Sequence, residues 1–447
     1  MAGAGNSGAS VAQQFERPAR TRYWVVFFAI TLAVVTYIDR VSMSQAAPFV
    51  AADLKLTKVQ IGWAFSAFAF AYALFEIPGG WLGDWLGPRR VLMRIVLWWS
   101  FFTAATGWAW NHTSLVVTRF VFGAGEAGCF PNLAKSFTTW LLPHERVRAT
   151  GLMWLAARWA GAFTPLLVLW LIRTLSWRMA FQIFGVLGVI WGCFFWHWYR
   201  DRPSEHKGVS RAEVELLRGG EETAAGHGDV PWRRFLASKT VWLLWLQYFS
   251  VSYGWSFYIT WLPTYIREGR GQTLENSALL AVLPLFFGGI GSFVGGFSLA
   301  GLTGWLSGPR AARKFIAAVG CAGAGALLIC SVHIHAALAG MVIIGLASFC
   351  NDLALAPAWA ACMDVGGKYT GSLSGSMNMM GNLGGAVAPV MVGYLLTWTH
   401  QNWAVPFYVA GGIYFLGSIA WLTLDPVTLL DTQPADLSLS QIPSAAT

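Results

Sequence analysis

The sequence predicts an all-α membrane protein with twelve transmembrane helices in two six-helix bundles, and three observations carry this prediction. Of the 447 residues, 56% are hydrophobic and 11% are charged, and the mean hydropathy is +0.52, which is outside the range of water-soluble proteins. Apolar stretches of roughly 20 residues, the length that crosses a bilayer, recur about twelve times. One long polar stretch, residues 200–239, separates them into six and six, as in transporters built from two related halves.

The predicted spans define the domain organisation. They cover residues 23–47, 60–85, 91–110, 114–137, 149–174, 177–199, 240–266, 277–301, 315–331, 336–363, 371–398 and 403–424. We therefore expect an N-terminal tail (1–22), a first bundle (23–199), a cytoplasmic linker (200–239), a second bundle (240–424) and a C-terminal tail without regular structure (425–447). Within the linker, residues 210–218 are expected to form a short surface helix that Ser210 caps.

The distribution of basic residues predicts the orientation. Most of the 30 Lys and Arg residues fall in loops on the side of the N-terminus, which is the positive-inside bias of inner (plasma) membrane proteins. No apolar stretch precedes Tyr23, so no cleaved secretory signal is expected, and both termini are predicted to be cytoplasmic. The net charge of +9 would by itself suggest a nucleic acid or acidic partner, but the distribution of the charges indicates a lipid bilayer partner, and no nucleic acid partner is expected.

Ionisable residues interrupt the predicted spans at two places. Asp39-Arg40 lies in the first span, and Arg119 and Glu126 lie seven residues apart in the fourth, nearly on one helix face. A charge at bilayer depth costs about 2.5 to 3.5 kcal/mol on insertion scales, so such residues are retained mainly where an ion or polar substrate must be bound. The sequence therefore predicts transport of a charged compound.

The loop after the second span has the pattern G-x-x-x-D-x-x-G-x-R-R. Its fixed residues are Gly80, Asp84, Gly87, Arg89 and Arg90. Glycine permits close helix approach, the aspartate can accept hydrogen bonds from an Arg or a helix N-terminus, and the arginines anchor the inner interface. The loop resembles the signature of the major facilitator superfamily, which implies a conformational latch. The corresponding loop of the second half (295–314) keeps glycines and cations but lacks the aspartate, so we expect the full latch in the first half only.

Within that superfamily the chain resembles the anion:cation symporters, which include the galactonate, glucarate and hexuronate carriers. Four stretches carry the resemblance, at residues 37–40, 66–80, 119–131 and 375–385. The resemblance implies that Arg40 and Arg119 bind the substrate carboxylate and that Asp39 and Glu126 carry protons. It also implies proton-coupled symport of a sugar acid (an aldonate, aldarate or hexuronate) by alternating access. The family default is a monomer, with protons as the coupling ion and no cofactor.

Physical chemistry supports these roles and leaves one alternative open. A guanidinium stays charged and presents a planar fork that matches a carboxylate. A substrate that competes for the arginines would make Asp39 or Glu126 easier to protonate. Alternatively, Arg40 and Arg119 neutralise Asp39 and Glu126 as packing pairs; adjacent helical residues point about 100° apart, so Asp39 and Arg40 would each face a different helix.

Two residues depart from the pattern of these carriers. Glu76 replaces a glutamine, and Arg158 adds a cation where related sequences have neutral residues. Either the two pair across helices, or Arg158 is a third anion ligand for a larger or doubly charged substrate. Further candidate substrate ligands, which are equally suited to helix packing, are Tyr37, Tyr72, Asn378 and Asn382. Asp352 is a weaker candidate, expected near the outer end of its span and in solvent.

Other classes of protein are disfavoured. The sequence has no P-loop, no nucleophile-base constellation and no metal-ligand cluster, so neither an enzyme nor a metal site is expected. The remaining alternatives are an uncoupled organic-anion facilitator or channel, an anion exchanger, and a membrane sensor, for which the linker is too short and polar to act as an output domain. A neutral-sugar carrier would leave two or three arginines without a partner charge.

Overall fold

The computed structural model describes residues 20–56, 58–224, 230, 232–262, 265–273, 276 and 280–430, and within them it contains helices and no strand. The helices of the first half are α1 (Tyr23–Leu54), α2 (Lys58–Leu86), α3 (Pro88–Thr106), α4 (His112–Glu126), α5 (Cys129–Trp140), α6 (Pro143–Thr174) and α7 (Trp177–Trp198). Those of the second half are α10 (Lys239–Thr260), η2 (Tyr265–Gly269), α13 (Val282–Trp305), α14 (Pro309–Val332), α15 (Ala337–Leu353), α16 (Leu355–Gly366), η3 (Gly367–Tyr369), α17 (Thr370–Trp398) and α18 (Ala404–Thr423).

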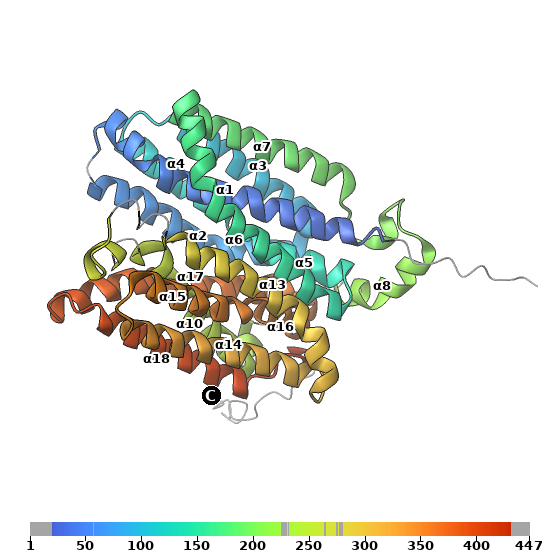
Figure 1. The fold of residues 1–447 in the computed structure, drawn as a ribbon. Helices are drawn as coiled ribbons and strands as arrows, with labels where there is room; N and C mark the ends of the chain where they lie inside the picture. Colours follow the sequence, from blue (N-terminus) through green and yellow to red (C-terminus); the bar gives the residue numbers. More distant parts are fainter. Residues whose placement is uncertain are drawn as a thin grey trace, which may run out of the picture.

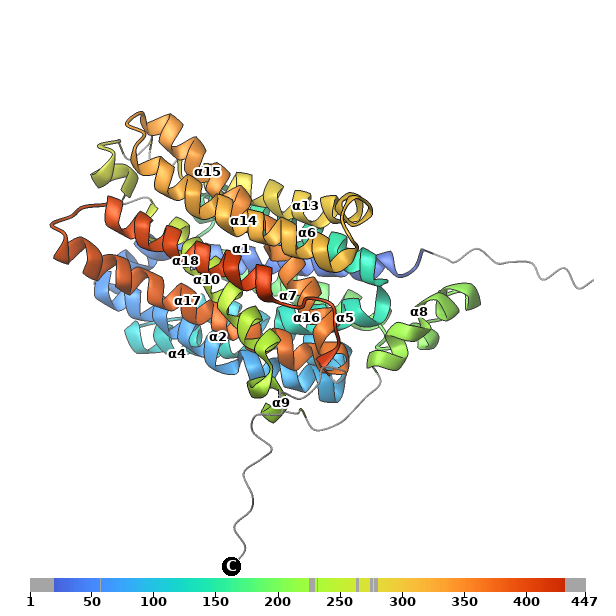
Figure 2. The same ribbon diagram turned by 90° about the horizontal axis from the view of Figure 1, so that it is seen from below.

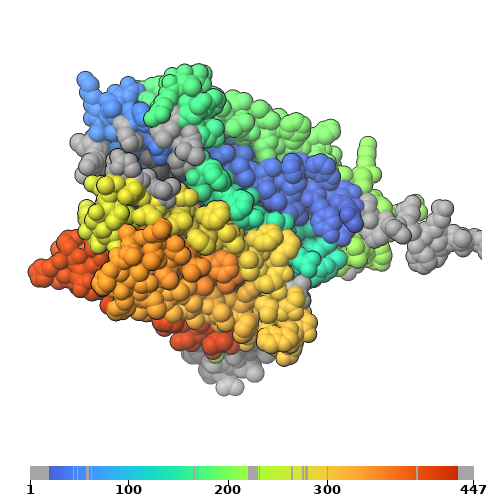
Figure 3. Space-filling model, viewed as in Figure 1, coloured from blue at the N-terminus to red at the C-terminus, as the bar shows by residue number. Residues whose placement is uncertain are grey.

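The two sets of helices form two halves that meet along a seam. Figure 1 shows the first half, blue to green, above the second half, yellow to red, and Figure 2 shows the same helices from below. Across the seam, α2 packs along α17 and α6 packs along α13. The space-filling view in Figure 3 shows the two colour blocks in contact along this line.

The surface of the helices is suited to lipid. Seven stretches of the described residues are long and apolar enough to cross a bilayer, and one of them, Ala337–Trp398, runs through α15, α16 and α17. Large apolar side chains such as Phe70, Phe194 and Leu338 are more than half exposed. A soluble monomer rarely exposes so much apolar surface, whereas a bilayer covers it.

Two of the predicted spans are broken helices, which the sequence analysis did not anticipate. The span at 114–137 is interrupted between α4 and α5 by Gly128, which has φ +85° and lies against α2; a Cβ there would stand 2.6 Å from the Cα of Gly79. The span at 336–363 is interrupted at Ala354, and α16 carries Pro357, which has no N–H to donate, in its first turn. Each break places a polar residue, Glu126 or Asp352, close to the end of a helix.

The linker is attached to the first half through charged residues. Its helix α8 (Arg211–Ala224) begins as expected after Ser210, whose Oγ accepts from the backbone N–H of Glu213 at 3.3 Å. Arg22, just before α1, donates to Glu213 and to Glu145 at the start of α6, both at 3.0 Å. Burial alone would raise the pKa of Glu145, but the hydrogen bonds from Arg22 and Tyr23 outweigh it and lower that pKa. The linker also contains η1 (Pro203–Glu205) and α9 (Trp232–Ala237).

The C-terminal segment begins with ordered contacts. Asp425 pairs with Arg310 at 2.9 Å, and Arg313 donates to the backbone oxygen of Pro426, also at 2.9 Å. Residues 425–430 therefore depart from the expected unstructured tail because the first turn of α14 supplies donors to them. The remainder of that tail, 431–447, and residues 1–19 of the N-terminal tail lie outside the described residues.

Candidate functional site

A cavity of about 260 Å³ lies between the halves. The first half contributes Tyr37 and Arg40 of α1 and Trp154 and Arg158 of α6, and the second half contributes Trp255 of α10 and Asn378 and Asn382 of α17, among others. Five of the predicted substrate ligands thus line one cavity: Tyr37, Arg40, Arg158, Asn378 and Asn382. Arg119 and Tyr72 are not among its lining residues.

Arg40 lines the cavity and is paired with the buried carboxylate of Glu126. Its Nε donates to Oε1 of Glu126 at 2.5 Å, and its guanidinium carbon lies 4.6 Å from the centre of the Tyr72 ring. The side chain of Arg40 is 24% exposed, whereas that of Glu126 is 1% exposed. Oε2 of Glu126 is buried and has no hydrogen-bond partner among the described residues. The cation therefore faces the cavity, and the acid that neutralises it lies behind.

Arg119 and Asp39 form a second buried layer behind the cavity. Arg119 is 2% exposed, and its guanidinium carbon lies 4.4 Å from the centre of the Phe122 ring and 5.0 Å from that of Phe68. Asp39 is also 2% exposed and is close enough to Arg119 and Glu126 for electrostatic interaction. Neither carboxylate oxygen of Asp39 has a hydrogen-bond partner in the described part of the chain. Helix periodicity predicted that Arg119 and Glu126 share a face, but not that this face is covered by α2.

Arg158 makes an ion pair with the other half. Its Nε donates to Oδ2 of Asp352 at 2.8 Å, its Nη2 donates to Oδ1 at 3.2 Å, and its Nη1 donates to the Tyr37 hydroxyl at 3.0 Å. Asp352 is fully buried at the end of α15, so the expectation of a solvated residue near the outer end is wrong. The sequence does not predict this pairing because the partners are 194 residues apart and nothing local links them.

Glu76 also has its partner in the other half. Nδ2 of Asn378 donates to its Oε1 at 2.7 Å, and its Oε2 is buried without a hydrogen-bond partner among the described residues. The possible pairing of Glu76 with Arg158 is therefore not formed, because each is engaged by a different residue of the second half. Asn382 donates to the backbone oxygen of Asn378 at 2.8 Å, which leaves its own side-chain oxygen for the cavity it lines.

The predicted latch connects the two halves through Asp84. Its carboxylate accepts from the backbone N–H groups of Gly371 at 2.9 Å and Ser372 at 2.6 Å, and from the Ser372 hydroxyl at 2.6 Å. These are the first N–H groups of α17, where a helix favours negative charge. Gly80 allows this approach, since a Cβ there would stand 2.2 Å from the oxygen of Gly371. We call this end of the molecule the latch end.

The other latch residues contact the first half and the start of the linker in the described structure. Gly87 has φ +84°, and its turn presents the N–H of Arg89 to Asp201 at 2.8 Å. Arg89 also donates to the backbone oxygen of Trp196 and lies over the Trp196 ring, while Arg90 is exposed. Burial raises the pKa of Asp201 even though this N–H and the nearby arginines oppose the shift.

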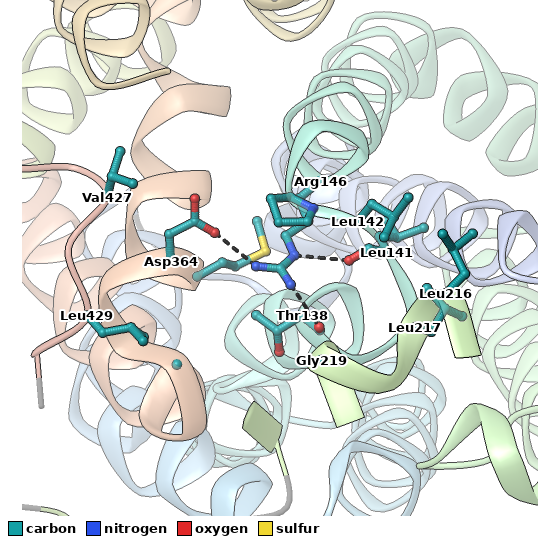
Figure 4. A pocket seen from close by; sticks show the side chains of 13 residues that line it. Thr138, Leu141, Leu142, Arg146, Leu216, Leu217, Gly219, Asp364, Val427 and Leu429 are labelled. Atoms are coloured by element: carbon teal, nitrogen blue, oxygen red, sulfur yellow. Dashed lines mark hydrogen bonds and ion pairs between the residues drawn. The ribbon is translucent and has the colours of Figure 1, made fainter. Parts of the chain in front are cut away.

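Three further charged residues that the sequence did not single out, Lys135, Arg146 and Asp364, join the halves at the latch end. Lys135 of α5 pairs with Asp84 at 3.3 Å and donates to the backbone oxygen of Lys368. Arg146 of α6 pairs with Asp364 of α16 at 2.9 Å, and Arg313 of α14 pairs with the same carboxylate. Figure 4 shows Arg146 directed at Asp364 in a cavity of about 400 Å³, with Leu216 and Leu217 of α8 on another wall.

The ionisable residues around the central cavity form what we call the central cluster. It contains Asp39, Arg40, Glu76, Arg119, Glu126, Arg158 and Asp352. The central cluster has one more carboxyl group than guanidinium groups. When an anion enters, the charges of the cluster and the anion together can therefore balance only if carboxyl groups of the cluster are protonated. No group of three or more potential metal ligands is present among the described residues.

Two helical halves around a polar cavity, with apolar outer faces and ionisable residues at mid-depth, define a multi-pass membrane transporter and not an enzyme. The model of the Major Facilitator Superfamily matches residues 29–389. The chain belongs to the major facilitator superfamily, and its twelve predicted spans fit that fold.

Relatives with similar sequences are transporters of organic anions. The chain is 34% identical to "Probable sulfoacetate transporter SauU" of Cupriavidus necator, over 92% of this chain and 96% of the relative. It is 29% identical to the "Hexuronate transporter" of Bacillus subtilis (89% and 93% covered) and 28% identical to the "D-galactonate transporter" of Escherichia coli (91% and 96%). The predicted resemblance to sugar-acid carriers is thereby confirmed at the level of the family.

Solved structures share the fold of this chain. The proton:xylose symporter XylE superposes with a TM-score of 0.73 at 11% identity, covering 92% of this chain and 98% of that one. The human organic anion transporter MFSD10 superposes with a TM-score of 0.67 at 14% identity, covering 91% and 100%. At these identities the likeness shows the fold alone.

Proposed function

We propose that this chain is a proton-coupled symporter of a small organic anion, located in the inner (plasma) membrane, with the latch end and both termini in the cytoplasm. The observation that carries the proposal is the pair between Arg40, which faces the cavity, and Glu126, which is buried behind it. Relatives named for hexuronate, galactonate and sulfoacetate support an organic acid as the substrate. The functional unit is proposed to be a monomer that needs no cofactor.

The coupling follows from competition for one cation. An anion that binds Arg40 through its guanidinium fork takes the place of Glu126, whose buried carboxylate then loses the cation that is hydrogen-bonded to it. Protonation removes the cost of that bare charge, so proton and substrate binding favour one another, and by linkage each raises the affinity of the other equally. Asp39, one layer deeper, is proposed as the second proton carrier, coupled electrostatically to Glu126 and Arg119.

The substrate is proposed to be a small carboxylate, with sugar acids and sulfoacetate as the first compounds to test. Arg40 and Arg158 supply charge, and Tyr37, Asn378 and Asn382 supply donors and acceptors suited to hydroxyl groups. Arg119 and Tyr72 are proposed to act from behind the cavity wall, by setting the charge and position of Asp39 and Arg40.

Uptake into liposomes tests the proposal. Purified protein is reconstituted, and accumulation of labelled D-galactonate, glucuronate and sulfoacetate is measured with and without an acidic exterior. We expect accumulation of at least one compound with the pH gradient only, and we expect Glu126→Gln to exchange substrate across the membrane without accumulating it. Glu215→Gln, at a side chain that is 75% exposed, is the matched control. Uptake that ignores the pH gradient, stops when the inner and outer concentrations are equal and persists in Glu126→Gln would instead indicate an uncoupled facilitator or exchanger.

A further inference from the structure

Arg158 is the second cation on the wall of the central cavity. Tyr37 lies between it and Arg40: the Tyr37 hydroxyl accepts from Nη1 of Arg158 at 3.0 Å, and the Tyr37 ring centre lies 5.8 Å from the guanidinium carbon of Arg40. All three residues line the cavity. Two guanidinium groups are thus presented to one small cavity, one at the hydroxyl of Tyr37 and the other over its ring.

The orientation of Arg158 does not depend on its ion pair alone. The ring of Trp255 lies over the guanidinium, 3.3 Å from its carbon, and holds it by a cation–π contact. Three of the five N–H donors of an arginine are accounted for by Asp352 and Tyr37. The guanidinium therefore keeps its place against the aromatic ring when the carboxylate beside it is exchanged for another anion.

Asp352 has hydrogen-bond donors other than Arg158. Its Oδ1 accepts from Nδ2 of Asn351 at 2.6 Å, and its Oδ2 accepts from the hydroxyl of Ser292 at 3.3 Å. Both donors belong to the second half, so the carboxylate stays hydrogen-bonded after Arg158 has left it. These donors would also stabilise a purely structural ion pair, so the distinguishing feature is that Arg158 lines the cavity, which a pair that serves packing alone does not need.

Resting on the function proposed above, we propose that Arg158 and Tyr37 form a second anion subsite and that the preferred substrate is a short dianion. One anionic group, a carboxylate or a sulfonate, binds Arg40 in place of Glu126, and the other binds Arg158 in place of Asp352. The cavity, at about 260 Å³, is smaller than the usual range of sites for drug-sized ligands, which suits a compound with only a few atoms between its two charges. Arg158 is therefore the residue that determines specificity for the second charge.

Equilibrium binding to the purified full-length protein tests this inference. Dissociation constants are measured by calorimetry for two matched pairs, glucarate against gluconate and malonate against acetate. We expect the dianion of at least one pair to bind at least tenfold more tightly than its monoanion. In Arg158→Gln this ratio should fall to about one while monoanion binding stays within about threefold, and in Asp352→Asn the dianion should bind more tightly, since its competitor has lost its charge.

The outcomes separate the two proposals. If Arg158→Gln weakens monoanions and dianions equally, or if the wild type binds both equally, the second subsite is wrong while an organic-anion transporter remains supported by the binding itself. If none of the four compounds, nor the three used for uptake, binds at all, both proposals fail. Arg158→Met serves where the glutamine variant does not fold: it also removes the charge, and a dianion preference that it leaves undiminished would overturn the subsite.

Discussion

Glu76 is a carboxyl group at the centre of the molecule without an ion-pair partner within 4 Å in the described structure. It is fully buried, and its one described side-chain hydrogen bond comes from Asn378 of the opposite half. Its second oxygen has no partner among the described residues. An acceptor is needed at this position to satisfy Asn378, but a charge is not.

Replacement of Glu76 separates these two requirements. Glu76→Gln retains an oxygen for Nδ2 of Asn378 and removes the ionisable group, so we expect a free energy of unfolding equal to or above that of the wild type. Glu76→Ala leaves Asn378 buried without its acceptor and should lower the free energy of unfolding by about 1–3 kcal/mol. Thermal and denaturant unfolding of both variants checks this, and equal destabilisation by Gln and Ala would contradict it.

Arg40 is expected to need its planar fork and not merely its charge. Lysine at this position keeps the charge but presents a single ammonium, which cannot bind one carboxylate through two parallel hydrogen bonds. We expect Arg40→Lys to raise the KM for uptake at least tenfold. Arg211→Lys, on the exposed face of α8, should leave it unchanged. A normal KM in Arg40→Lys would argue that Arg40 pairs structurally with Glu126.

Sequence reasoning found most individual residues of the site but not how they pair. An ionisable residue in an apolar span is conspicuous, which is why Arg40, Glu126 and Arg158 were identified. Its partner is set by tertiary packing, so the assignment of Asp352 to Arg158 and of Asn378 to Glu76 could not be made from local patterns. For the same reason nothing in the sequence placed Arg119 behind Phe68 and not in the cavity.

At the scale of elements, three segments converge at Arg22. This residue precedes α1 and donates to Glu145, at the start of α6, and to Glu213, within α8. The hydroxyl of Tyr23 donates to the same Glu145 oxygen at 2.7 Å. The charged contact therefore attaches the linker helix to the ends of two helices of the first half.

This contact predicts a pH-dependent contribution to stability. The pKa of Glu145 is lowered in the folded protein, so its stabilisation is fully present above the unfolded value of about 4.3 and is lost as pH falls through the lowered folded pKa. At pH 7 we expect Glu145→Gln to unfold more easily than the wild type by about 1.5–3 kcal/mol, the range for hydrogen bonds to charged groups. Melting curves between pH 7 and pH 3 should show this difference shrinking at acid pH. A constant difference, or one also seen in Glu215→Gln, would contradict the assignment.

At this scale the sequence predicts where the helices occur, but it does not predict where they are interrupted. Runs of apolar residues of the right length identify spans regardless of their partners. The interruptions at Gly128 and Ala354 depend on where another helix comes close, as Gly79 does to Gly128, and hydropathy does not report that contact.

At the scale of the whole molecule, the charged contacts between the halves concentrate at the latch end. Asp84 binds the N-terminus of α17, Lys135 binds Asp84 and the oxygen of Lys368, and Arg146 binds Asp364. Alternating access requires that these contacts break together when the latch end opens. Their removal should therefore shift the equilibrium between the two access states.

Asp84→Asn tests this shift. Loss of the negative charge at the N-terminus of α17 costs about 0.3–2 kcal/mol, which corresponds to about a two- to thirtyfold change in the equilibrium. The readout is the rate at which a thiol reagent labels a single cysteine placed at Ser374, which is fully buried on α17, in a protein whose native cysteines are replaced. We expect labelling to accelerate within that range. Arg90→Gln, at an exposed latch position without a described contact to the second half, is the control, and unchanged labelling in Asp84→Asn would contradict the role of the cap.

Because Asp84 of the first half accepts from the N-terminus of α17 in the second half, the contact predicts how the two halves behave as separate fragments. A gene cut within the linker would yield two fragments, one with a carboxylate that has lost its N–H donors and one with a helix that has lost its cap. Each fragment thus carries the group that the other fragment has lost. The two groups meet where Gly80 and Gly371 leave no space for a side chain. Co-expressed fragments should therefore reassemble in the native register. When each is expressed alone, the fragment that contains α17 should be the less stable of the two.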